Sequence, residues 1–494
     1  MLYQLHEMQR SFLTPLMQWA DASSKLFSNP VSPFAHTPFS QRIAAGYELM
    51  YRLGKEYEKP AFGLKTTTIN GEEVGIIERI VVDKPFCKLL HFKKDMSDTA
   101  FAALGQPAVL VVAPLSGHHA TLLRDTVKAL LVEHDVYITD WVDARMVPLA
   151  DGPFHLDDYV FYVQDFIRHL GPDVHVISVC QPTVPVLAAI ALMATNKDPK
   201  LPRTMTMMGG PIDPRKSPTA VNDLAIEKPY SWFENTVIYS VPGNYPGFGR
   251  KVYPGFLQHA GFIAMNPGRH AQSHREFYRH LVRGDDDSAE AHRKFYDEYN
   301  AVLDMPAEYY LDTIKTVFQE YSLPKGTWKV GGQLVRPQDI ESVALLTVEG
   351  ELDDISGLGQ TSAALTLCSG IPKDKKHEFV VEKAGHYGIF SGRRWREIVC
   401  PKITEFIRAN QLSGAATKNR GHAPRFFFRA PRTTVASGSS FDREAQLYWS
   451  TASITGRKCN AQQVFRGCPL WAPGRHQRPL TTCATRPVAI ATSA

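Results

Sequence analysis

The middle of the chain alternates short apolar runs with longer amphipathic stretches. We expect strands at residues 108–114, 135–141, 174–179 and 204–210, with helices between them at 118–134, 155–171 and 183–196. Continuous apolar strands that alternate with helices are typical of a parallel sheet that helices cover on both faces. The same rhythm resumes with expected strands at 342–350 and 377–385 and a closing helix at 393–410.

Two regions depart from this rhythm. Residues 64–93 contain three short strand-like runs, and Asn70-Gly71 between the first two is a strong signal for a tight hairpin turn. Residues 211–340 are rich in aromatic residues and prolines and contain helical patterns. An insertion between two strands of a parallel sheet usually lies over their carboxyl ends, where such sheets bind ligands. We expect a helical cap there, whose aromatic side chains form either its own core or an apolar surface for a substrate.

The first twenty residues form an amphipathic pattern. Apolar side chains recur close to the helical period, at Leu2, Leu5, Met8, Phe12, Leu16 and Trp19. Thr14 and Pro15 have the sequence of a helix cap and a first helical position, so we expect a helix to restart there. Such an arm either packs on the body of the protein or adheres to an apolar surface. The charges within MLYQLHEMQR argue against a secretory signal.

The composition changes near the end of the chain. Residues 412–494 are rich in Arg, Thr, Ala and Pro without a sustained period, and we expect them to be disordered. From Gly414 onward there are twelve Lys or Arg against two Asp or Glu, so that residues 1–413 have a net charge of −5 although the whole chain has +5. The tail composition also suits translation in another reading frame, or a basic arm that binds an anionic partner.

Composition and charge narrow the class of protein. The 494 residues are 44% hydrophobic and 21% charged, which is typical of a globular protein with a large core. A mildly acidic body argues against a nucleic-acid-binding surface. No run of 18 apolar residues predicts a transmembrane helix. Seven cysteines without a CxxC motif argue against a disulfide framework or a zinc ribbon, so we expect a cytoplasmic protein.

These patterns divide the chain into five segments. We expect an N-terminal helical arm at 1–60, the first part of an α/β core at 61–210, the cap at 211–340, the second part of the core at 341–411, and the tail at 412–494.

Cys180 occupies a position where such sheets carry chemistry. It follows the apolar run 174–179 and precedes a helix, in Ser178-Val179-Cys180-Gln181-Pro182. The α/β-hydrolases expose their nucleophile at a sharp turn of this kind, and a helix N-terminus lowers the pKa of a thiol. The usual turn has glycine two residues on either side of the nucleophile, where this chain has Ser178 and Pro182. An isolated cysteine after an apolar run is otherwise a small buried side chain.

Two further residues follow strands at the same expected edge of the sheet. Asp353 follows the strand at 342–350, and His386 follows the strand at 377–385. The order nucleophile, acid, histidine is that of the α/β-hydrolases. We expect a triad in which His386 takes the proton of the Cys180 thiol and Asp353 orients the imidazole and stabilises its cation. Asp354 is the neighbour most easily confused with Asp353.

The surrounding loops supply the remaining candidates. An oxyanion needs two donors, and we expect one from the backbone N–H of Gln181 and the other from Leu115 or Ser116 in the loop after 108–114. His118 and His119 are expected to be loop or cap contacts, since no carboxylate–histidine spacing suggests a metal, and no cofactor is implied. Residues 140–145 are expected to form a structural loop with a local Asp–Arg pair, or to contribute to the rim of the site.

Four separated stretches together resemble a known family. HVISVCQPTVPVLAA, DVYITDWVDARMVP, TMTMMGGPID and AGHYGIFSGRRWRE resemble the intracellular poly(3-hydroxybutyrate) (PHB) depolymerases, over about residues 1–411. The resemblance implies an α/β-hydrolase fold with the nucleophile at Cys180, the acid at Asp353 and the histidine at His386. It also implies a bacterial enzyme on PHB granules in the cytoplasm that hydrolyses the amorphous polymer to 3-hydroxybutyrate and its oligomers. The tail has no counterpart in this resemblance.

Other functions remain open on the residues alone. A polyhydroxyalkanoate synthase has a similar triad but transfers acyl groups from coenzyme A to a growing chain. A granule-coating protein would have Cys180 as a structural residue, and a cytoplasmic esterase would take small esters or oligomers. The residues also leave open whether water or a thiol such as coenzyme A accepts the acyl group, and which oligomeric state the protein adopts.

Overall fold

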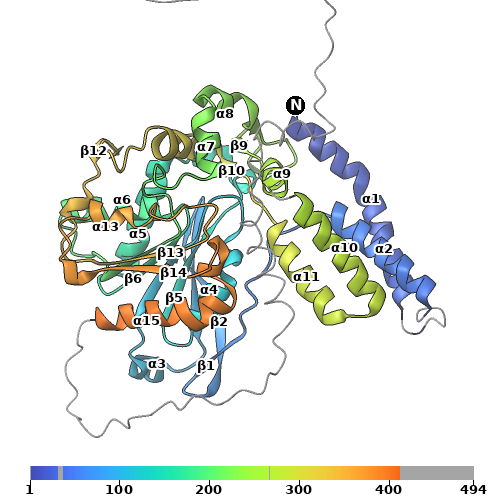
Figure 1. Ribbon diagram of the computed structural model, residues 1–494, viewed down its shortest axis with the longest axis horizontal. Coiled ribbons are helices and arrows are strands. Elements are labelled where there is room, and N and C mark those ends of the chain that lie inside the picture. The colour runs from blue at the N-terminus through green and yellow to red at the C-terminus, as the bar shows by residue number, and fades with distance from the viewer. Residues whose placement is uncertain (1, 30, 32–36, 266, 412–494) are drawn as a thin grey trace, which may run out of the picture. The chain divides into compact units, whose positions relative to one another are not determined.

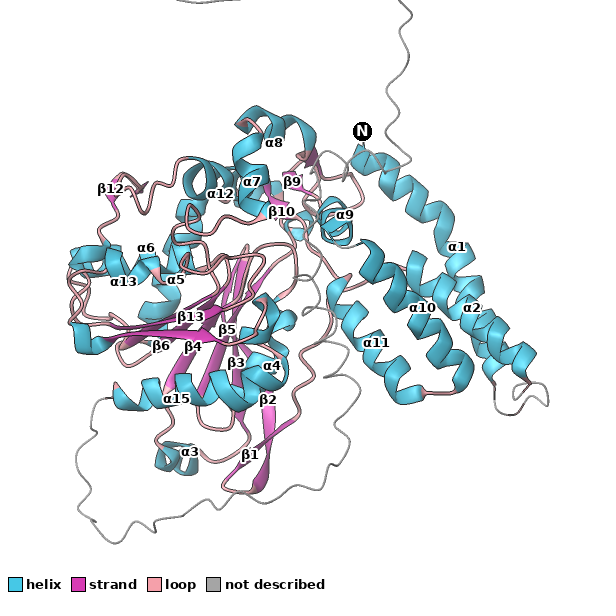
Figure 2. Ribbon diagram, in the orientation of Figure 1, coloured by secondary structure: helices cyan, strands magenta, loops and turns pink. Residues whose placement is uncertain are grey.

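A nine-stranded, mostly parallel sheet forms the centre of the computed structural model, which describes residues 2–29, 31, 37–265 and 267–411 (Figures 1 and 2). In the order of the sheet, the strands are β1 (Thr66–Ile69), β2 (Glu72–Lys84), β3 (Cys87–Lys94), β5 (Asp135–Trp141), β4 (Ala108–Val112), β6 (His175–Val179), β7 (Thr204–Met208), β13 (Ala344–Gly350) and β14 (Lys376–Val381). Neighbouring strands are antiparallel from β1 to β5 and parallel from β5 to β14. The predicted tail at 412–494 lies outside the described residues.

The predicted hairpin at the start of the sheet is confirmed. Asn70 and Gly71 join β1 to β2 with φ angles of 52° and 88°. A two-residue turn of this kind needs a left-handed backbone at both positions, which Asn and Gly adopt at little cost. The turn sets the register in which Ile69 pairs with Glu72.

Helices cover both faces of the sheet, as the alternating pattern predicts. On one face lie α4 (Arg124–Leu130) and α15 (Cys400–Ala409), and on the other lie α5 (Leu156–Leu170) and α6 (Thr183–Thr195) (Figure 1). Every residue of α6 from Thr183 to Met193 is buried, and so is every residue of β6. The core is therefore thickest around β6 and α6, the two elements that hold Cys180 between them.

Shorter elements complete the core. They are α3 (Asp98–Leu104), α13 (Ala363–Leu367), α14 (Gly392–Arg394), the 3₁₀ turns η1 (Ala120–Leu123), η2 (Ala144–Met146), η3 (Leu149–Asp151), η5 (Pro337–Asp339), η6 (Lys373–Lys375) and η7 (His386–Ile389), and a π-helical turn η8 (Trp395–Val399).

The insertion at 211–340 is mainly helical, as predicted. It consists of α7 (Ala220–Glu227), α8 (Tyr230–Thr236), α9 (Gly255–Met265), α10 (Pro267–Arg283), α11 (Asp286–Tyr299), α12 (Ala307–Thr313) and a π-helical turn η4 (Ile314–Gln319), with the short strands β8 (Tyr239–Ser240), β9 (Lys251–Tyr253), β10 (Met305–Pro306), β11 (Lys329–Val330) and β12 (Gln333–Leu334).

Two N-terminal helices precede the sheet, α1 (Leu2–Ser28) and α2 (Pro38–Gly54). The predicted restart at Pro15 is wrong, because α1 runs through it as one helix. The hydroxyl groups of Ser11 and Thr14 donate to backbone carbonyls one turn earlier, each at 2.9 Å. α2 packs against both α1 and α10 of the cap (Figure 1). The arm thus contacts the cap, and the segment boundaries given above stay predictions.

The order and direction of the strands identify an α/β-hydrolase fold. Counted from β2, the eight core strands lie in the order 1-2-4-3-5-6-7-8, with the second strand antiparallel to its neighbours. A helical cap follows the sixth of these strands, and a strand-to-helix turn follows the fifth. Within the described residues, no helix is both long and apolar enough to span a membrane.

Candidate active site

Cys180 lies in the turn between β6 and α6. Its backbone has a φ of 69°, in the left-handed region, and its N–H donates to the carbonyl oxygen of Met208 at the end of β7 (2.7 Å). A non-glycine residue in this conformation costs on the order of 1 kcal/mol, and such strain tends to concentrate at functional sites. The thiol is free and partly exposed, so the turn presents it at the carboxyl edge of the sheet.

Gly210, after β7, makes room for this turn. A Cβ on Gly210 would lie 2.4 Å from the carbonyl oxygen of Cys180 and 1.8 Å from Thr183 Oγ1. The tight approach that the usual turn obtains from its own glycines is thus provided by the neighbouring strand, which is why Ser178 and Pro182 fit at their positions. The sequence analysis missed this role, although the Gly209-Gly210 pair directly after a strand was its signal.

His386 and Asp353 are hydrogen-bonded to each other. Nδ1 of His386 lies 2.8 Å from Oδ2 of Asp353. The other carboxylate oxygen of Asp353 accepts from the backbone N–H groups of Ile355 (2.9 Å) and Ser356 (2.8 Å). Both members of the pair are buried, whereas Asp354 is exposed. Asp353 is therefore the carboxylate that faces the histidine.

The side chain of His386 also interacts with that of Cys180. Burial lowers the pKa of His386, but its interactions with Asp353 and Cys180 raise this pKa well above its ordinary value. The rings of Tyr387 and Phe390 stand edge-on to the imidazole, each with a centroid distance of 5.7 Å. The structure thus brings together three predicted site residues that follow β6, β13 and β14.

The predicted oxyanion donors also lie at this edge. Gln181 directly follows Cys180, and Leu115 and Ser116 lie in the loop after β4, the strand next to β6. Within the described part of the chain, the backbone N–H groups of these three residues donate to no backbone or side-chain acceptor. Backbone donors in a protein interior are normally paired, so unpaired ones beside a nucleophile are available to a negative charge.

Backbone hydrogen bonds join the cap to the loop that follows β4. The N–H of Leu303 donates to the carbonyl oxygen of Gly117 (2.7 Å), and His118 forms an antiparallel bridge with Val302. A Cβ on Gly117 would lie 2.7 Å from Gln258 Oε1 and 3.2 Å from the ring of Phe262. The cap therefore packs directly against the loop that holds the predicted oxyanion donors Leu115 and Ser116.

The two histidines of this loop have structural contacts. Nε2 of His118 lies 3.2 Å from the carbonyl oxygen of Tyr299, and its ring stacks on Phe262 at 4.8 Å, so the predicted cap contact is confirmed for His118. Burial lowers the pKa of His118 to about 4 and that of His119 to about 3, so both are neutral at physiological pH. Among the residues that the structure describes, no group of three His, Cys, Asp or Glu side chains is placed to hold a metal.

Three tyrosines, two of them buried and Tyr387 partly buried, surround Cys180, and the sequence analysis did not single them out. Tyr159 comes from α5, Tyr309 from α12 of the cap, and Tyr387 from η7. Burial raises the pKa of each phenol, and the negative charge of Cys180 adds to the increase. Tyr159 and Tyr309 stack with a centroid distance of 5.5 Å. The wall around the thiol is therefore aromatic with polar tips, and only Tyr387, next to His386 in the sequence, had a local signal.

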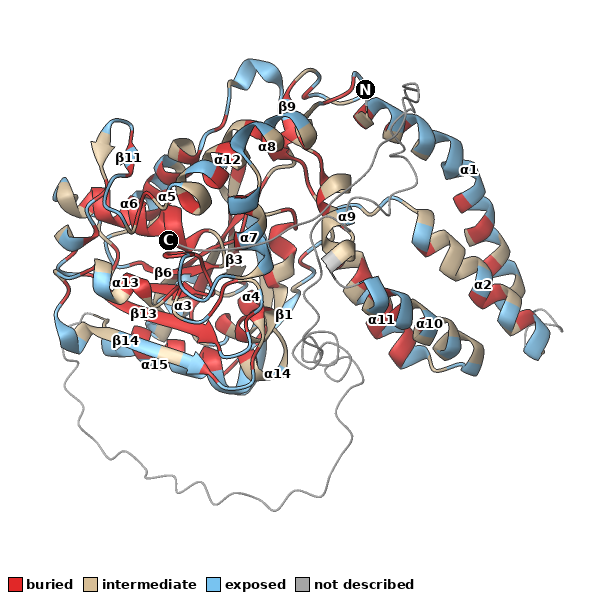
Figure 3. Cartoon of the chain, turned by 45° about the horizontal axis from the view of Figure 1, so that its top comes forward, coloured by how far each residue is buried: buried red, intermediate tan, exposed pale blue. Residues whose placement is uncertain are grey.

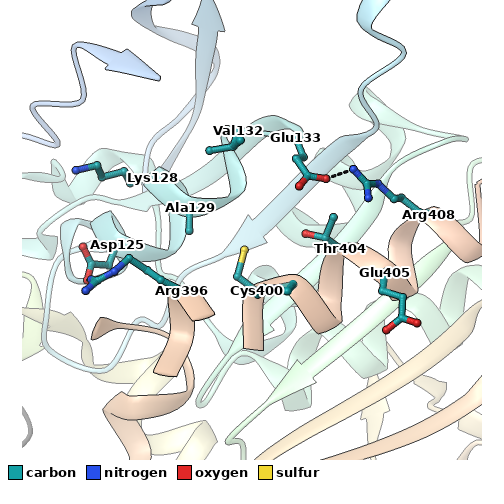
Figure 4. Close-up of a pocket in the computed structure, with 11 residues that line it drawn as sticks. Asp125, Lys128, Ala129, Val132, Glu133, Arg396, Cys400, Thr404, Glu405 and Arg408 are labelled. Atoms are coloured by element: carbon teal, nitrogen blue, oxygen red, sulfur yellow. Dashed lines mark hydrogen bonds and ion pairs between the residues drawn. The ribbon is translucent and has the colours of Figure 1, made fainter. Parts of the chain in front are cut away.

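The other cysteines of the described chain are buried, namely Cys87, Cys368 and Cys400. Burial raises the pKa of Cys368 to about 12 and that of Cys400 to about 11, so both remain protonated thiols. Cys400 borders a groove of about 630 Å³ between α4 and α15, whose rim is charged and includes the ion pair of Glu133 and Arg408 (Figure 4). The residues around Cys180 do not line this groove, which lies on the flank of the sheet.

The loop after β5 contains the predicted local Asp–Arg pair. Asp143 Oδ2 lies 3.0 Å from Nε of Arg145, and Asp143 Oδ1 also accepts from the backbone N–H of Asp304 (3.2 Å) in the cap. Asp140, at the end of β5, pairs instead with Lys59. These carboxylates connect separate segments of the chain and do not touch the Asp353–His386 pair.

The cap and the second half of the core match a known family. Residues 209–411 match the family model described as PHB de-polymerase C-terminus. The matched segment contains Asp353 and His386 and begins after Cys180. The chain is therefore similar to the PHB depolymerase family over residues 209–411. Together with the strand order, this makes the protein an ester hydrolase of the α/β-hydrolase type.

The solved structures that are similar to this chain share little sequence identity with it. They include the bromoperoxidase from Bacillus anthracis (12% identity, TM-score 0.41, covering 68% of this chain and 100% of that chain), the 2-hydroxy-6-oxo-6-phenylhexa-2,4-dienoate hydrolase from Rhodococcus sp. strain RHA1 (13%, 0.38, 68% and 99%), and the monoacylglycerol lipase of Paleococcus ferrophilus (14%, 0.37, 62% and 96%). No curated protein matches the chain. The similarity to PHB depolymerases rests on residues 209–411 and not on these structures.

Proposed function

We propose that the protein hydrolyses the ester bonds of amorphous PHB in cytoplasmic storage granules, releasing 3-hydroxybutyrate and its oligomers, with Cys180 as the nucleophile. One observation carries the proposal. The partly exposed Cys180, in a left-handed strand-to-helix turn, interacts with His386, which is itself hydrogen-bonded to Asp353 at 2.8 Å. The nucleophile, the base and the orienting carboxylate are thus arranged in the spatial order that acyl transfer requires.

The first half of the reaction acylates the enzyme. His386, whose pKa is raised, takes the proton of the Cys180 thiol. The sulfur attacks an ester carbonyl carbon, and the oxyanion accepts hydrogen bonds from the N–H of Gln181 and from that of Leu115 or Ser116. The C–O bond of the ester then breaks, and the leaving alkoxide takes the proton of His386 Nε2. A thioester remains on Cys180.

The second half releases the acyl group. Neutral His386 takes a proton from water, and the resulting hydroxide attacks the thioester carbonyl. The C–S bond breaks, so the products are a carboxylic acid and the Cys180 thiolate facing an imidazolium again. Throughout, Asp353 keeps Nδ1 of His386 protonated and stabilises its charged form.

The surroundings of the thiol suit an uncharged polyester. The tyrosines at 159, 309 and 387 give a largely apolar wall that can contact methyl and methylene groups. The hydroxyl of Tyr159 donates to the carbonyl oxygen of Ala113 (3.2 Å), whereas that of Tyr309 has no hydrogen-bond partner within the described residues and can donate to an ester oxygen. No ion pair is needed to recognise such a substrate.

Release of soluble 3-hydroxybutyrate from amorphous PHB granules tests the proposal. We expect the wild type to release product and Cys180→Ala to lose on the order of 10³-fold or more of this rate while unfolding at the same denaturant concentration. Absence of release by the wild type would contradict the proposal.

Two further substrates separate the alternatives. Faster cleavage of a soluble trimer with no action on granules would identify a small-ester esterase, and polymerisation of 3-hydroxybutyryl-coenzyme A would identify a synthase. Adding free coenzyme A to the granule assay tests the acceptor, because a thiol acceptor would yield 3-hydroxyacyl-coenzyme A in place of the free acid.

A further inference from the structure

We propose that the outward face of α1 docks the enzyme on the apolar surface of its polyester substrate. The docking stripe consists of six exposed apolar residues: Leu5, Met8, Phe12, Leu16, Trp19 and Leu26. The choice of polyester as the partner rests on the function proposed above. The existence and composition of the stripe do not depend on that function.

The orientation of α1 is the reverse of what its amphipathic pattern suggests. Its buried positions are Tyr3, Glu7, Met17, Ala20 and Ser24, which include a carboxylate and a hydroxyl group. The apolar residues that a helix normally hides are turned outward, and Phe12 is 81% exposed. Figure 3 shows this outer side of α1 in the colour of exposed residues. A contiguous exposed apolar surface of this kind usually marks an interaction site.

Polar contacts hold α1 in this orientation. The hydroxyl of Tyr3 donates to Asp304 (2.7 Å), and Glu7 accepts from the hydroxyl of Tyr245 (2.9 Å) and from Arg10 (2.8 Å). Asp304 and Tyr245 lie in the cap insertion, so α1 cannot turn its apolar side inward without breaking its hydrogen bonds to them. The stripe is therefore a fixed feature of the folded protein.

The charge of this face identifies the kind of partner. Between Leu2 and Ser23, all of which the structure describes, the charged side chains are Glu7 and Arg10, which pair with each other, and Asp21, which pairs with Lys25. The outward positions beside the stripe are uncharged and include Gln9 and Gln18. Anionic membranes recruit helices through several exposed Lys and Arg, whereas the one exposed basic side chain along the described residues of the stripe is Lys25, which pairs with Asp21. An uncharged polyester offers apolar groups and carbonyl acceptors only, which matches apolar side chains flanked by amide donors.

A second copy of the chain is the main competing partner. Leu5, Phe12, Trp19 and Leu26 recur every seven residues, as in a coiled coil. However, a stripe of this length is about 30 Å long and about 10 Å wide, so it covers roughly 300 Å² where a stable interface buries about 800 Å² per partner. The charged flanking positions that normally select a coiled-coil partner are also missing. These observations favour a large, flat and uncharged surface over a helix.

Binding to PHB particles in the Cys180→Ala background tests the proposal without consuming the polymer. We expect Phe12→Gln/Trp19→Gln to weaken co-sedimentation with amorphous PHB particles by roughly 10- to 100-fold, since each large apolar side chain contributes about a factor of ten when buried. The matched control is Ile226→Gln/Ile398→Gln, which removes two apolar side chains that are 55% and 48% exposed elsewhere. The control should bind like the parent.

The remaining readouts separate this proposal from its rivals and from the proposed function. With Cys180 restored, the α1 variant should cleave a soluble trimer at the parental rate and granules more slowly. Unchanged particle binding in the variant would overturn the proposal. So would a dimer of the parent in sedimentation velocity that the variant abolishes, or equal binding to phosphatidylcholine vesicles. A wild type that binds particles through α1 but cleaves no ester would overturn the proposed function and leave the docking surface standing.

Discussion

At the scale of single residues, Gly209 connects the nucleophile turn to the histidine. It has a φ of +54°, and a Cβ on it would lie 2.7 Å from Ile389 Cδ1, 3.3 Å from His386 Cε1 and 3.4 Å from Asp353 Oδ2. We expect Gly209→Ala to lower kcat/KM for a soluble ester by about tenfold or more, because a displacement of His386 by a fraction of an ångström already slows proton transfer.

Gly105→Ala is a matched control for Gly209→Ala. Gly105 has nearly the same φ of +58°, but nothing lies within 4 Å of the Cβ that would be added. Both variants should lose on the order of 1 kcal/mol from the left-handed backbone, measured by urea unfolding, and only Gly209→Ala should lose activity. Equal activity in the two variants would mean that Gly209 does not shape the site.

Asp353 also sets the protonation of the site. After burial, which acts in the opposite direction, its charge is the largest influence on the pKa of His386 and raises it. Asp353→Asn removes this charge, so the pKa of His386 falls and the imidazolium is lost at lower pH. We expect the alkaline limb of kcat/KM against pH to move to lower pH, together with a rate loss on the order of 10³-fold. Asp354→Asn should leave the limb in place, and equal effects of the two variants would contradict the assignment.

At the scale of elements, the loop after β13 is held by one buried carboxylate. Glu349 accepts from the backbone N–H groups of Gly359 (3.0 Å), Thr361 (2.7 Å) and Ser362 (3.1 Å). The loop that these bonds close carries Asp353. All three N–H groups donate to Oε1, and that of Gly359 also lies 3.1 Å from Oε2. We expect Glu349→Gln to destabilise the protein by about 1–3 kcal/mol in urea unfolding, because the three hydrogen bonds lose their charged acceptor and the new amide N–H₂ faces the N–H of Gly359.

Glu351→Gln is the comparison for Glu349→Gln. Glu351 is exposed and accepts from a single backbone N–H, that of Lys383 (2.7 Å). Its substitution should cost much less, because water replaces the lost hydrogen bond. Similar losses in both variants would show that burial of Glu349 is not what holds the loop.

Sequence reasoning was sound where a local pattern decides the structure. The strand at 135–141 and the turn at Asn70-Gly71 needed no knowledge of distant partners. The same reasoning placed Cys180, Asp353 and His386 at one edge, since parallel strands end together, and their catalytic roles stay predictions. It could not tell which face of α1 is buried. The period reveals two faces, but the burial of Glu7 depends on Tyr245, more than two hundred residues away.

At the scale of the whole molecule, one buried polar cluster joins three parts of the chain. Asp143 lies in the loop after β5, Asp304 in the cap, and Tyr3 in α1. Asp304 accepts from Tyr3 and from the N–H of Gly255 (2.8 Å), and Asp143 accepts from Arg145. The core, the cap and the N-terminal helix therefore depend on the same few carboxylate oxygens, so the ionisation of this cluster affects the cohesion of the entire fold.

Asp143 makes that dependence measurable. Burial, with a smaller contribution from Asp304, raises the pKa of Asp143 to about 7 in the folded protein, from an ordinary value of 3.8. Between these pH values the unfolded chain has released a proton that the folded protein retains, so this group contributes most stability below pH 4 and loses that contribution as the pH rises through 7. Asp143→Asn cannot ionise, and we expect its free energy of unfolding, relative to that of the wild type, to increase from pH 4 to pH 7.

Asp213→Asn should show the opposite sign, which makes it the control for Asp143→Asn. Although burial raises the pKa of Asp213, its hydrogen bonds to Arg215 lower it below the ordinary value. This group therefore contributes stability above its ordinary pKa and loses it as the pH falls, so the variant should be less stable than the wild type at neutral pH and approach it in acid. Urea unfolding at half-unit steps of pH measures both differences. A constant offset for Asp143→Asn over this range would mean that the cluster joining core, cap and α1 is ionised throughout and does not respond to pH.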